Sequence, residues 1–276
     1  MLLRRLTAFI CATILAAAVP ALADSRLEAR YTVTLTGITV GKGVWMLDIG
    51  DDGYASAGSA RVSGPLRLIA PGEGSAAARG NLSGAKVVPQ NYSLTSVSGR
   101  KTDDVRMTMA ANVIKDFTAL PPPSQGGDRV PITEEHKKGV VDPMSAALMP
   151  VTGNGDLMQP QSCNRTIPIF DGRHRYDIVM GYQRTEQAKD MQGYSGPLIV
   201  CRVAYQPVAG HRAERKQVLE LKMNQTILVW LAPVAGTRVL VPARVSMDTM
   251  FGTLIVQATQ FSVEPRPRQA ARPPTK

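Results

Sequence analysis

The 276-residue chain has few cysteines and few histidines, three of each, and their spacing excludes two kinds of site. No Cys-x-x-Cys pair occurs, so a thiol redox site is not expected. His136, His174 and His211 neither recur at a four-residue interval nor flank a cysteine pair, which argues against a zinc site. Walker and EF-hand loops are also absent from the sequence, so we expect no nucleotide, metal or other cofactor.

Charged residues and long apolar runs are scarce as well. Only 20% of the residues are charged and 44% are hydrophobic, a balance that excludes a coiled coil and a wholly disordered chain. The apolar run over residues 6–19 is shorter than the roughly 20 residues that a membrane-spanning helix needs. With 24 glycines and 20 prolines, the composition favours a turn-rich globular protein built from β-sheet.

The segment 1–23 has the three parts of a secretory signal peptide. Two arginines precede the apolar run, and small residues at Ala21 and Ala23 match the pattern of the cleavage site. We expect cleavage between Ala23 and Asp24, which would export the mature chain. An uncleaved membrane anchor is the alternative.

Signal cleavage would remove Cys11 and leave Cys163 and Cys201. Two thiols in an oxidising compartment are expected to form a disulfide, with free thiols as the alternative. In the alternating stretch 197–205, Cys201 has the parity of the apolar residues, so the bridge is predicted to be buried.

The formal net charge of +10 is unevenly distributed. The segment 265–276 carries basic residues among prolines and no acid, which predicts an extended, disordered tail after a single β-rich domain at 24–264. This tail is either a solubilising extension or a weak contact with anionic lipid or cell-wall polymer. Nucleic acid is not an expected partner of an exported chain.

Alternation of apolar and polar residues predicts antiparallel strands through most of the chain. Residues 31–35 alternate in this way, and the slip of parity at Gly37 predicts a β-bulge there. We expect a turn at 41–43 and a loop over 116–138. Further strands are predicted over 60–69, 80–88, 92–97, 105–109, 166–170, 176–182, 197–205, 227–231, 239–245 and 253–261.

Two segments depart from the strand pattern. Asp142 can act as the N-cap of a short helix, Pro143 fits its first position, and Pro150 ends it. We expect this helix to cover a sheet edge or the open end of a barrel. The segment 216–222 fits a helix and a strand equally well.

Two polar motifs have residues that also occur at catalytic sites. Ser98 and Lys101 have Ser-x-x-Lys spacing but lie in a turn between strands. The cluster 171–177 offers three interpretations: an acid–histidine pair of Asp171 with His174, an anion site built from Arg173, His174 and Arg175, or a tight Asp-Gly turn with its charges in solvent. We favour the turn, because Asp-Gly between alternating apolar runs is a strong hairpin signal.

Four segments, at 35–41, 141–148, 167–176 and 241–253, together resemble the bacterial family called domain of unknown function 3108. The resemblance spans nearly the whole mature chain. It implies a periplasmic, β-rich fold with no established enzymatic activity. At a greater distance, the chain also resembles the β-spiral envelope-integrity proteins and the lipoprotein-carrier half-barrels. The positions that carry it are Gly37, Gly41, Asp142, Pro143, Asp171, Gly172, Pro242, Phe251 and Gly252.

The predicted fold class is therefore mainly β. We expect a curved antiparallel sheet, either a β-spiral or an incomplete barrel, with one or two short helices and the single disulfide. Such a sheet has a concave face, which some of the 12 methionines can line with adaptable apolar surface.

The leading hypothesis is a non-catalytic envelope protein that binds a lipid, lipoprotein or exported polypeptide in a concave apolar cavity. The main alternative is a structural or scaffolding module that contacts other envelope proteins and holds no small ligand. A hydrolase that uses Asp171 and His174 is disfavoured, because no nucleophile is placed with them.

Overall fold

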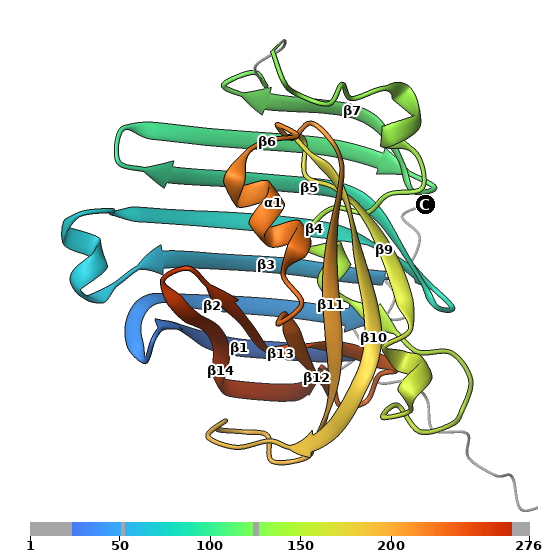
Figure 1. Cartoon of the computed structure of the whole chain (residues 1–276). Helices are drawn as coiled ribbons and strands as arrows, with labels where there is room; N and C mark the ends of the chain where they lie inside the picture. Colours follow the sequence, from blue (N-terminus) through green and yellow to red (C-terminus); the bar gives the residue numbers. More distant parts are fainter. Residues whose placement is uncertain (1–23, 51–52, 124–126, 267–276) are drawn as a thin grey trace, which may run out of the picture.

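One large antiparallel sheet dominates the protein (Figure 1). The computed structural model describes residues 24–50, 53–123 and 127–266. The strands are β1 (Asp24–Leu35), β2 (Ile38–Gly50), β3 (Gly53–Val62), β4 (Gly72–Ser83), β5 (Lys86–Ser98), β6 (Lys101–Ala110), β7 (Val113–Leu120), β8 (Met149–Pro150), β9 (Arg165–Phe170), β10 (Arg175–Gln187), β11 (Pro197–Ala209), β12 (Leu228–Pro233), β13 (Val239–Thr249) and β14 (Gly252–Arg266). The helical segments are the α-helix α1 (Lys216–Met223) and the 3-10 turns η1 (Gly64–Leu68), η2 (Glu134–Lys137), η3 (Ser145–Ala147) and η4 (Pro160–Ser162). None of the helices within the described ranges has the length and apolar character needed to cross a membrane.

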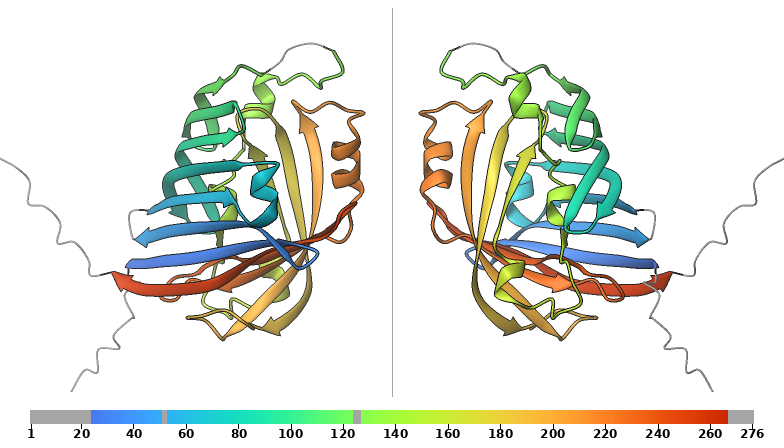
Figure 2. Two further views of the ribbon diagram at one scale, coloured as in Figure 1. Left: turned by 90° about the vertical axis from the view of Figure 1, so that its left-hand side faces the viewer. Right: turned by 90° about the vertical axis from the view of Figure 1, so that its right-hand side faces the viewer.

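The sheet consists of two meanders, β1–β7 and β9–β14, that share one long junction. Along the path β7-β6-β5-β4-β3-β2-β1-β14-β13-β12-β11-β10-β9, only the β1–β14 pair joins strands distant in sequence, and the short β8 pairs with β13 off this path. Strand β1 pairs with β14 from Asp24 opposite Arg266 to Leu35 opposite Leu254. Figure 2 shows that the sheet bends near this junction, so that β4–β7 face β9–β11.

The segment 138–141 links the two outer strands, β7 and β9. Lys138 forms a bridge with Val113 at the start of β7, and Val141 forms one with Ile169 in β9. The sheet is therefore an incomplete barrel with a strap across its seam, because a single segment hydrogen-bonds to both edges. This architecture confirms the predicted fold class.

Two apolar clusters hold the fold together. The larger one fills the space between the meanders, whereas the second lies on the other face of β10–β13, where α1 covers β11 (Figure 2). In β11, Leu198 and Val200 belong to the first cluster, and Ile199 and Cys201 to the second. A strand buried on both faces explains this continuous apolar run.

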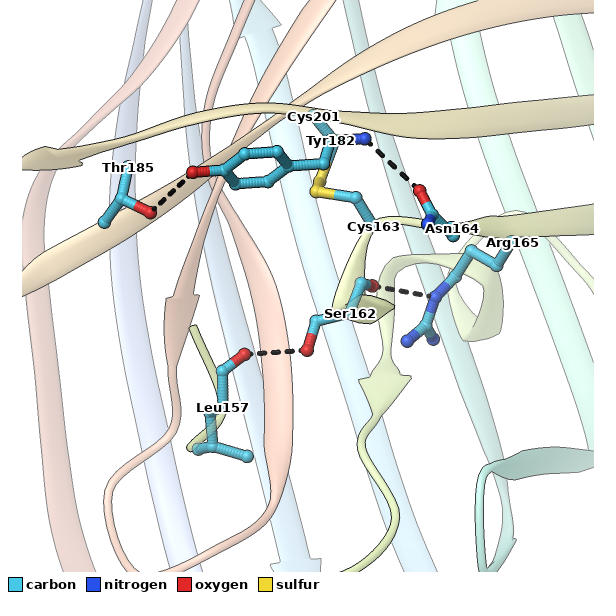
Figure 3. The surroundings of a disulfide bond; sticks show 8 residues. All are labelled: Leu157, Ser162, Cys163, Asn164, Arg165, Tyr182, Thr185 and Cys201. Carbon is cyan, nitrogen blue, oxygen red and sulfur yellow. Dashed lines mark hydrogen bonds between the residues drawn. A yellow bond between two sulfur atoms is a disulfide. The ribbon is translucent and has the colours of Figure 1, made fainter. Parts of the chain in front are cut away.

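The disulfide between Cys163 and Cys201 is formed, as predicted (Figure 3). The Cα atoms are 5.5 Å apart, the two residues are separated by 38 positions, and both are fully buried in the second cluster. The bridge ties the segment after η4 to the middle of β11. Beside it, Ser162 Oγ donates to the Leu157 carbonyl at 2.8 Å.

The β-bulge predicted at Gly37 exists, but it lies a few residues further along the chain. Gly37, with φ of +81°, forms the turn between β1 and β2 and not a bulge. The register shifts between Val33 and Thr34, which leaves Val40 as the extra residue of β2. The turn predicted at 41–43 is wrong, because these residues continue β2.

Several strand limits also differ from the prediction. The segment predicted as a strand over 60–69 contains the end of β3 and then η1, and the one over 80–88 crosses the turn between β4 and β5. The loop predicted over 116–138 is wrong at its beginning, since β7 continues to Leu120. Strands β3 and β4 are rich in alanine, serine and glycine, so their apolar pattern is weak.

The helix predicted after Asp142 is only the 3-10 turn η3. One α-type hydrogen bond forms, from Ala146 N to the Asp142 carbonyl at 2.9 Å, but the backbone is extended at Leu148 and enters β8 at Met149, so the helix does not continue. The segment left open at 216–222 is helical, as α1.

The predicted end of the β-rich domain at residue 264 falls inside β14, which continues to Arg266. The rest of the predicted basic tail, 267–276, and the predicted signal peptide, 1–23, lie outside the described residues. Cleavage after Ala23 therefore stays a prediction.

Candidate functional site

An apolar pocket of about 450 Å³ opens between the two meanders. Its floor is the core-facing side of β2–β4, and β13 and β14 form the opposite wall. The residues that line the pocket include Tyr31, Gly43, Trp45, Gly58, Ala60, Gly74, Ala76, Leu94, Met144, Pro242, Arg244 and Val256.

Small residues on neighbouring strands create the hollow. Gly43, Ala60 and Gly74 lie opposite one another across β2, β3 and β4, and Gly58 and Ala76 form the next row. Residues in register on one face of a sheet have their Cβ positions side by side, so a block of alanine and glycine leaves a depression. The pocket is thus encoded in the strand register.

Larger residues close the pocket on the side of the core. One row beyond Gly58 and Ala76, β3 and β4 again carry small residues, but the flanking strands contribute Leu47 and Tyr92, which are buried in the larger cluster. Large side chains from the flanking strands therefore border the depression on this side.

The walls of the pocket combine aromatic and flexible apolar groups. Tyr31 donates its hydroxyl to the Pro242 carbonyl at 2.7 Å, which links β1 to β13. Burial raises the pKa of Tyr31 above its ordinary value, so the phenol stays neutral. A side-chain carbon at Gly58 would lie 3.6 Å from Met144 Cε, so this methionine covers the floor there.

A β-bulge places one arginine, Arg244, in this pocket. Trp230 pairs with Arg244 and Leu231 with Pro242, which leaves Ala243 as the extra residue of β13. The bulge reverses the parity of the strand, so that Arg244 shares the inner face with Trp230. The Arg244 guanidinium lies 4.7 Å from the Trp230 ring centroid, a cation–π distance.

Arg244 forms no ion pair with a carboxylate among the described residues, although its charge contributes to the lowered pKa of Glu186 beside Trp230. Glu186 Oε2 accepts the Trp230 Nε1 proton at 2.8 Å, and the other oxygen pairs with Arg184. The hydrogen bond from Trp230, followed by the contact with Arg184, lowers the pKa of Glu186. Arg244 Nε is buried and has no hydrogen-bond partner among the described residues. A positive charge is thus available at the wall of an apolar pocket.

Below the pocket, Asp142 holds the turn that carries Met144. Its carboxylate accepts the backbone N–H groups of Met144 at 3.0 Å and Ser145 at 2.9 Å, and also contacts the Ser145 hydroxyl. Tyr54 hydrogen-bonds to the same hydroxyl at 2.5 Å. Asp142 is fully buried, and this burial, opposed by the hydrogen bonds, raises its pKa to about 6. We interpret the network as support for the pocket.

Residues 171–174 of the polar cluster form a turn that fastens the seam of the sheet, whereas 175–177 begin β10. The prediction that the charges of the cluster lie in solvent is wrong, because the side chains of Arg173, Arg175 and Asp177 are mostly buried and form ion pairs. Asp171 Oδ1 accepts the backbone N–H groups of Arg173 and His174 at 2.7 and 2.6 Å. Arg173 reaches the Leu120 carbonyl at 3.1 Å and Asp103 at 3.0 Å. Asp171 and His174 do lie together, 3.2 Å apart, but their contacts are those of a turn.

Gly172 allows that turn to approach β6. Its φ is +91°, and a Cβ would lie 2.5 Å from the Val105 Cγ1 atom. The turn interpretation also holds for Ser98 and Lys101, which pair across the β5–β6 hairpin.

The other motif positions fall into two groups. Asp142, Pro143 and Pro242 lie at or beside the pocket, whereas Gly37, Phe251 and Gly252 meet at one end of the sheet. Gly41 follows the bulge of β2. The sequence did not identify Arg244 or the small floor residues as part of a pocket. For the floor, the small residues at alternate positions of β3 and β4 were a signal that could have indicated the depression.

The model of the family described as protein of unknown function (DUF3108) matches residues 30–259. The chain belongs to this family. No curated protein matches it. The DUF3108 match confirms the resemblance noted in the sequence.

Two solved structures are similar to this DUF3108 protein at low sequence identity. One is a β-barrel-like protein of domain of unknown function DUF1849 from Brucella abortus, with 9% identity, a TM-score of 0.48, and coverage of 89% of this chain and 100% of that one. The other is a candidate lipoprotein from Parabacteroides distasonis, with 8% identity, a TM-score of 0.32, and coverage of 87% and 96%.

Proposed function

We propose that this DUF3108 protein is a non-catalytic, exported envelope protein that binds an anionic acyl lipid between its meanders. The single observation that carries the proposal is the apolar pocket of about 450 Å³ with Arg244 at its wall. Ligand pockets are mostly apolar and hold a few placed polar groups that orient the ligand. The acyl chain would lie on the small-residue floor, and the anionic group would face Arg244.

Arg244 suits an anionic head group because its guanidinium is held on Trp230, lines the apolar pocket and forms no ion pair among the described residues. A planar guanidinium binds carboxylate or phosphate through paired hydrogen bonds. The periplasm is the compartment we propose, supported by the signal-peptide pattern at 1–23 and by the disulfide, which persists in oxidising compartments.

Filling the floor tests the pocket. Ala60→Leu and Ala76→Leu each place a larger side chain in the space proposed for the acyl chain. We expect each variant to bind a fluorescent fatty acid roughly ten-fold or more weakly, since forcing extra methylenes into an occupied site costs roughly 1–3 kcal/mol. Titration of fluorescence measures the affinity.

The matched control is Ala57→Leu, on the opposite face of β3, which should bind as the wild type does. Native mass spectrometry of the wild-type protein from periplasmic extract should also show bound lipid. A wild-type protein that is empty and ignores the probe would refute lipid binding and favour the scaffolding alternative.

Removing the arginine charge tests the orientation of the ligand. Arg244→Gln should weaken binding of a fatty acid by roughly ten-fold to a hundred-fold, because a hydrogen bond to a charged group contributes roughly 1.5–3 kcal/mol. Competition with the fluorescent probe gives this value. Binding of the corresponding fatty alcohol should change much less, and an equal loss for both ligands would contradict the role of Arg244.

A further inference from the structure

Five large apolar side chains are exposed together at one end of the sheet. They lie on the turn between β1 and β2, on the β3–β4 connection, and on the turn between β13 and β14, at the left of Figure 1. Their exposed fractions run from 58% to 88%. We call this surface the apolar rim: Ile38, Leu68, Ile69, Met250 and Phe251.

Backbone hydrogen bonds make the rim one surface. Thr36 N donates to the Thr253 carbonyl at 2.9 Å, and Thr36 Oγ1 to the Phe251 carbonyl at 3.1 Å, so the two hairpin turns are joined. Ser63 N donates to the Val40 carbonyl at 2.9 Å, which attaches the β3–β4 connection to β2. The apolar side chains are therefore presented by a fixed framework.

Basic side chains surround the rim. Strands β2 and β3, the η1 segment, the β5–β6 turn and the start of β6 contribute a group that forms no ion pair among the described residues: Lys42, Arg61, Arg67, Arg100 and Lys101. Acidic side chains at this end are fewer. Glu73 lies opposite Arg61 in the register, and Asp248 accepts the Thr253 hydroxyl at 2.7 Å.

This combination has a specific physical meaning. Exposed apolar patches on a folded protein mark interaction sites, and patches that join apolar and unpaired basic residues fit the interface of an anionic bilayer. The apolar side chains enter the boundary between head groups and acyl chains, while the basic ones meet lipid phosphates.

We propose that the apolar rim docks this protein on the surface of an anionic lipid bilayer. The proposal goes beyond ligand binding and stands on the rim alone. Docking through the rim would place the pocket near the bilayer, because the floor residues Gly43, Ala60 and Gly74 lie within a few residues of the strand ends that carry the rim.

Flotation with lipid vesicles tests the proposal. The wild-type protein should float with vesicles of phosphatidylglycerol and phosphatidylethanolamine, and much less with phosphatidylcholine alone. Ile69→Asp and Phe251→Asp should each lower the ratio of vesicle-bound to free protein by roughly ten-fold or more. Added salt should weaken binding, since it screens the basic residues.

The control is Met46→Asp, a 49% exposed methionine in the middle of β2, which should float as the wild type does. Ala60→Leu should also float normally, so failure of the pocket and failure of the rim are distinguishable. Docking is overturned if the wild type ignores anionic vesicles, or if the rim variants float equally well. It is likewise overturned if light scattering shows a dimer that Phe251→Asp dissociates while vesicle binding is absent.

Discussion

Removal of the disulfide should lower the free energy of unfolding by up to about 4 kcal/mol. In the chain-entropy model, a bridge between residues separated by 38 positions stabilises the fold by restricting the unfolded chain to this extent. The cost should approach that limit here, because both cysteines are buried in the second cluster and their replacement also disturbs packing against β11. Chemical denaturation of Cys201→Ser under oxidising conditions measures the effect.

The double variant Cys163→Ser with Cys201→Ser separates the bridge from the loss of packing. Either substitution already opens the loop, so any further loss of stability in the double variant relative to Cys201→Ser measures the packing of Cys163 in the second cluster. Reductant should destabilise the wild type and leave both variants unchanged. Equal stability of the wild type with and without reductant would contradict a structural role for the bridge.

The disulfide and the overall fold could be predicted because both depend on simple patterns. The two cysteines expected to remain after the predicted signal cleavage can pair only with each other, and the parity of Cys201 assigned it to a buried face. Large apolar residues are frequent in β10, β11 and β14, so these strands were found. In β3 and β4 the inner positions hold alanine, serine and glycine, and the predicted strands were displaced there.

The displaced strands and the pocket have a common cause. Residues such as Gly58 and Ala76 are small at positions where a core strand would have large ones, so the feature that hides the strands from pattern analysis also creates the hollow. Arg244 was missed for a different reason. Its inward direction depends on the bulge at Ala243, and a bulge is set by pairing with β12, which is not visible in the β13 sequence alone.

The buried Asp142 carboxyl should make stability depend on pH between about 4 and 6. Its pKa rises from 3.8 to about 6 on folding, mainly through burial, so the native state holds this proton over a range where the unfolded chain has lost it. Stability therefore falls as pH increases through this range and is constant above it. A shift of about two units corresponds to about 3 kcal/mol.

The variant Asp142→Asn isolates this effect from the other carboxyl groups of the chain. Asparagine can still accept the backbone N–H of Ser145, and its amide can donate to the Ser145 hydroxyl, so the turn that carries Met144 should persist. Denaturation of both proteins at pH 4 and pH 7 gives the comparison. The wild type should lose about 2 kcal/mol more than the variant over this interval, since pH 4 already lies just above the unfolded pKa of 3.8, and only the wild type must ionise a carboxyl with no access to water. If the two proteins show the same change with pH, Asp142 is already ionised at pH 4, and its hydrogen bonds with Ser145 and Met144 outweigh the effect of burial.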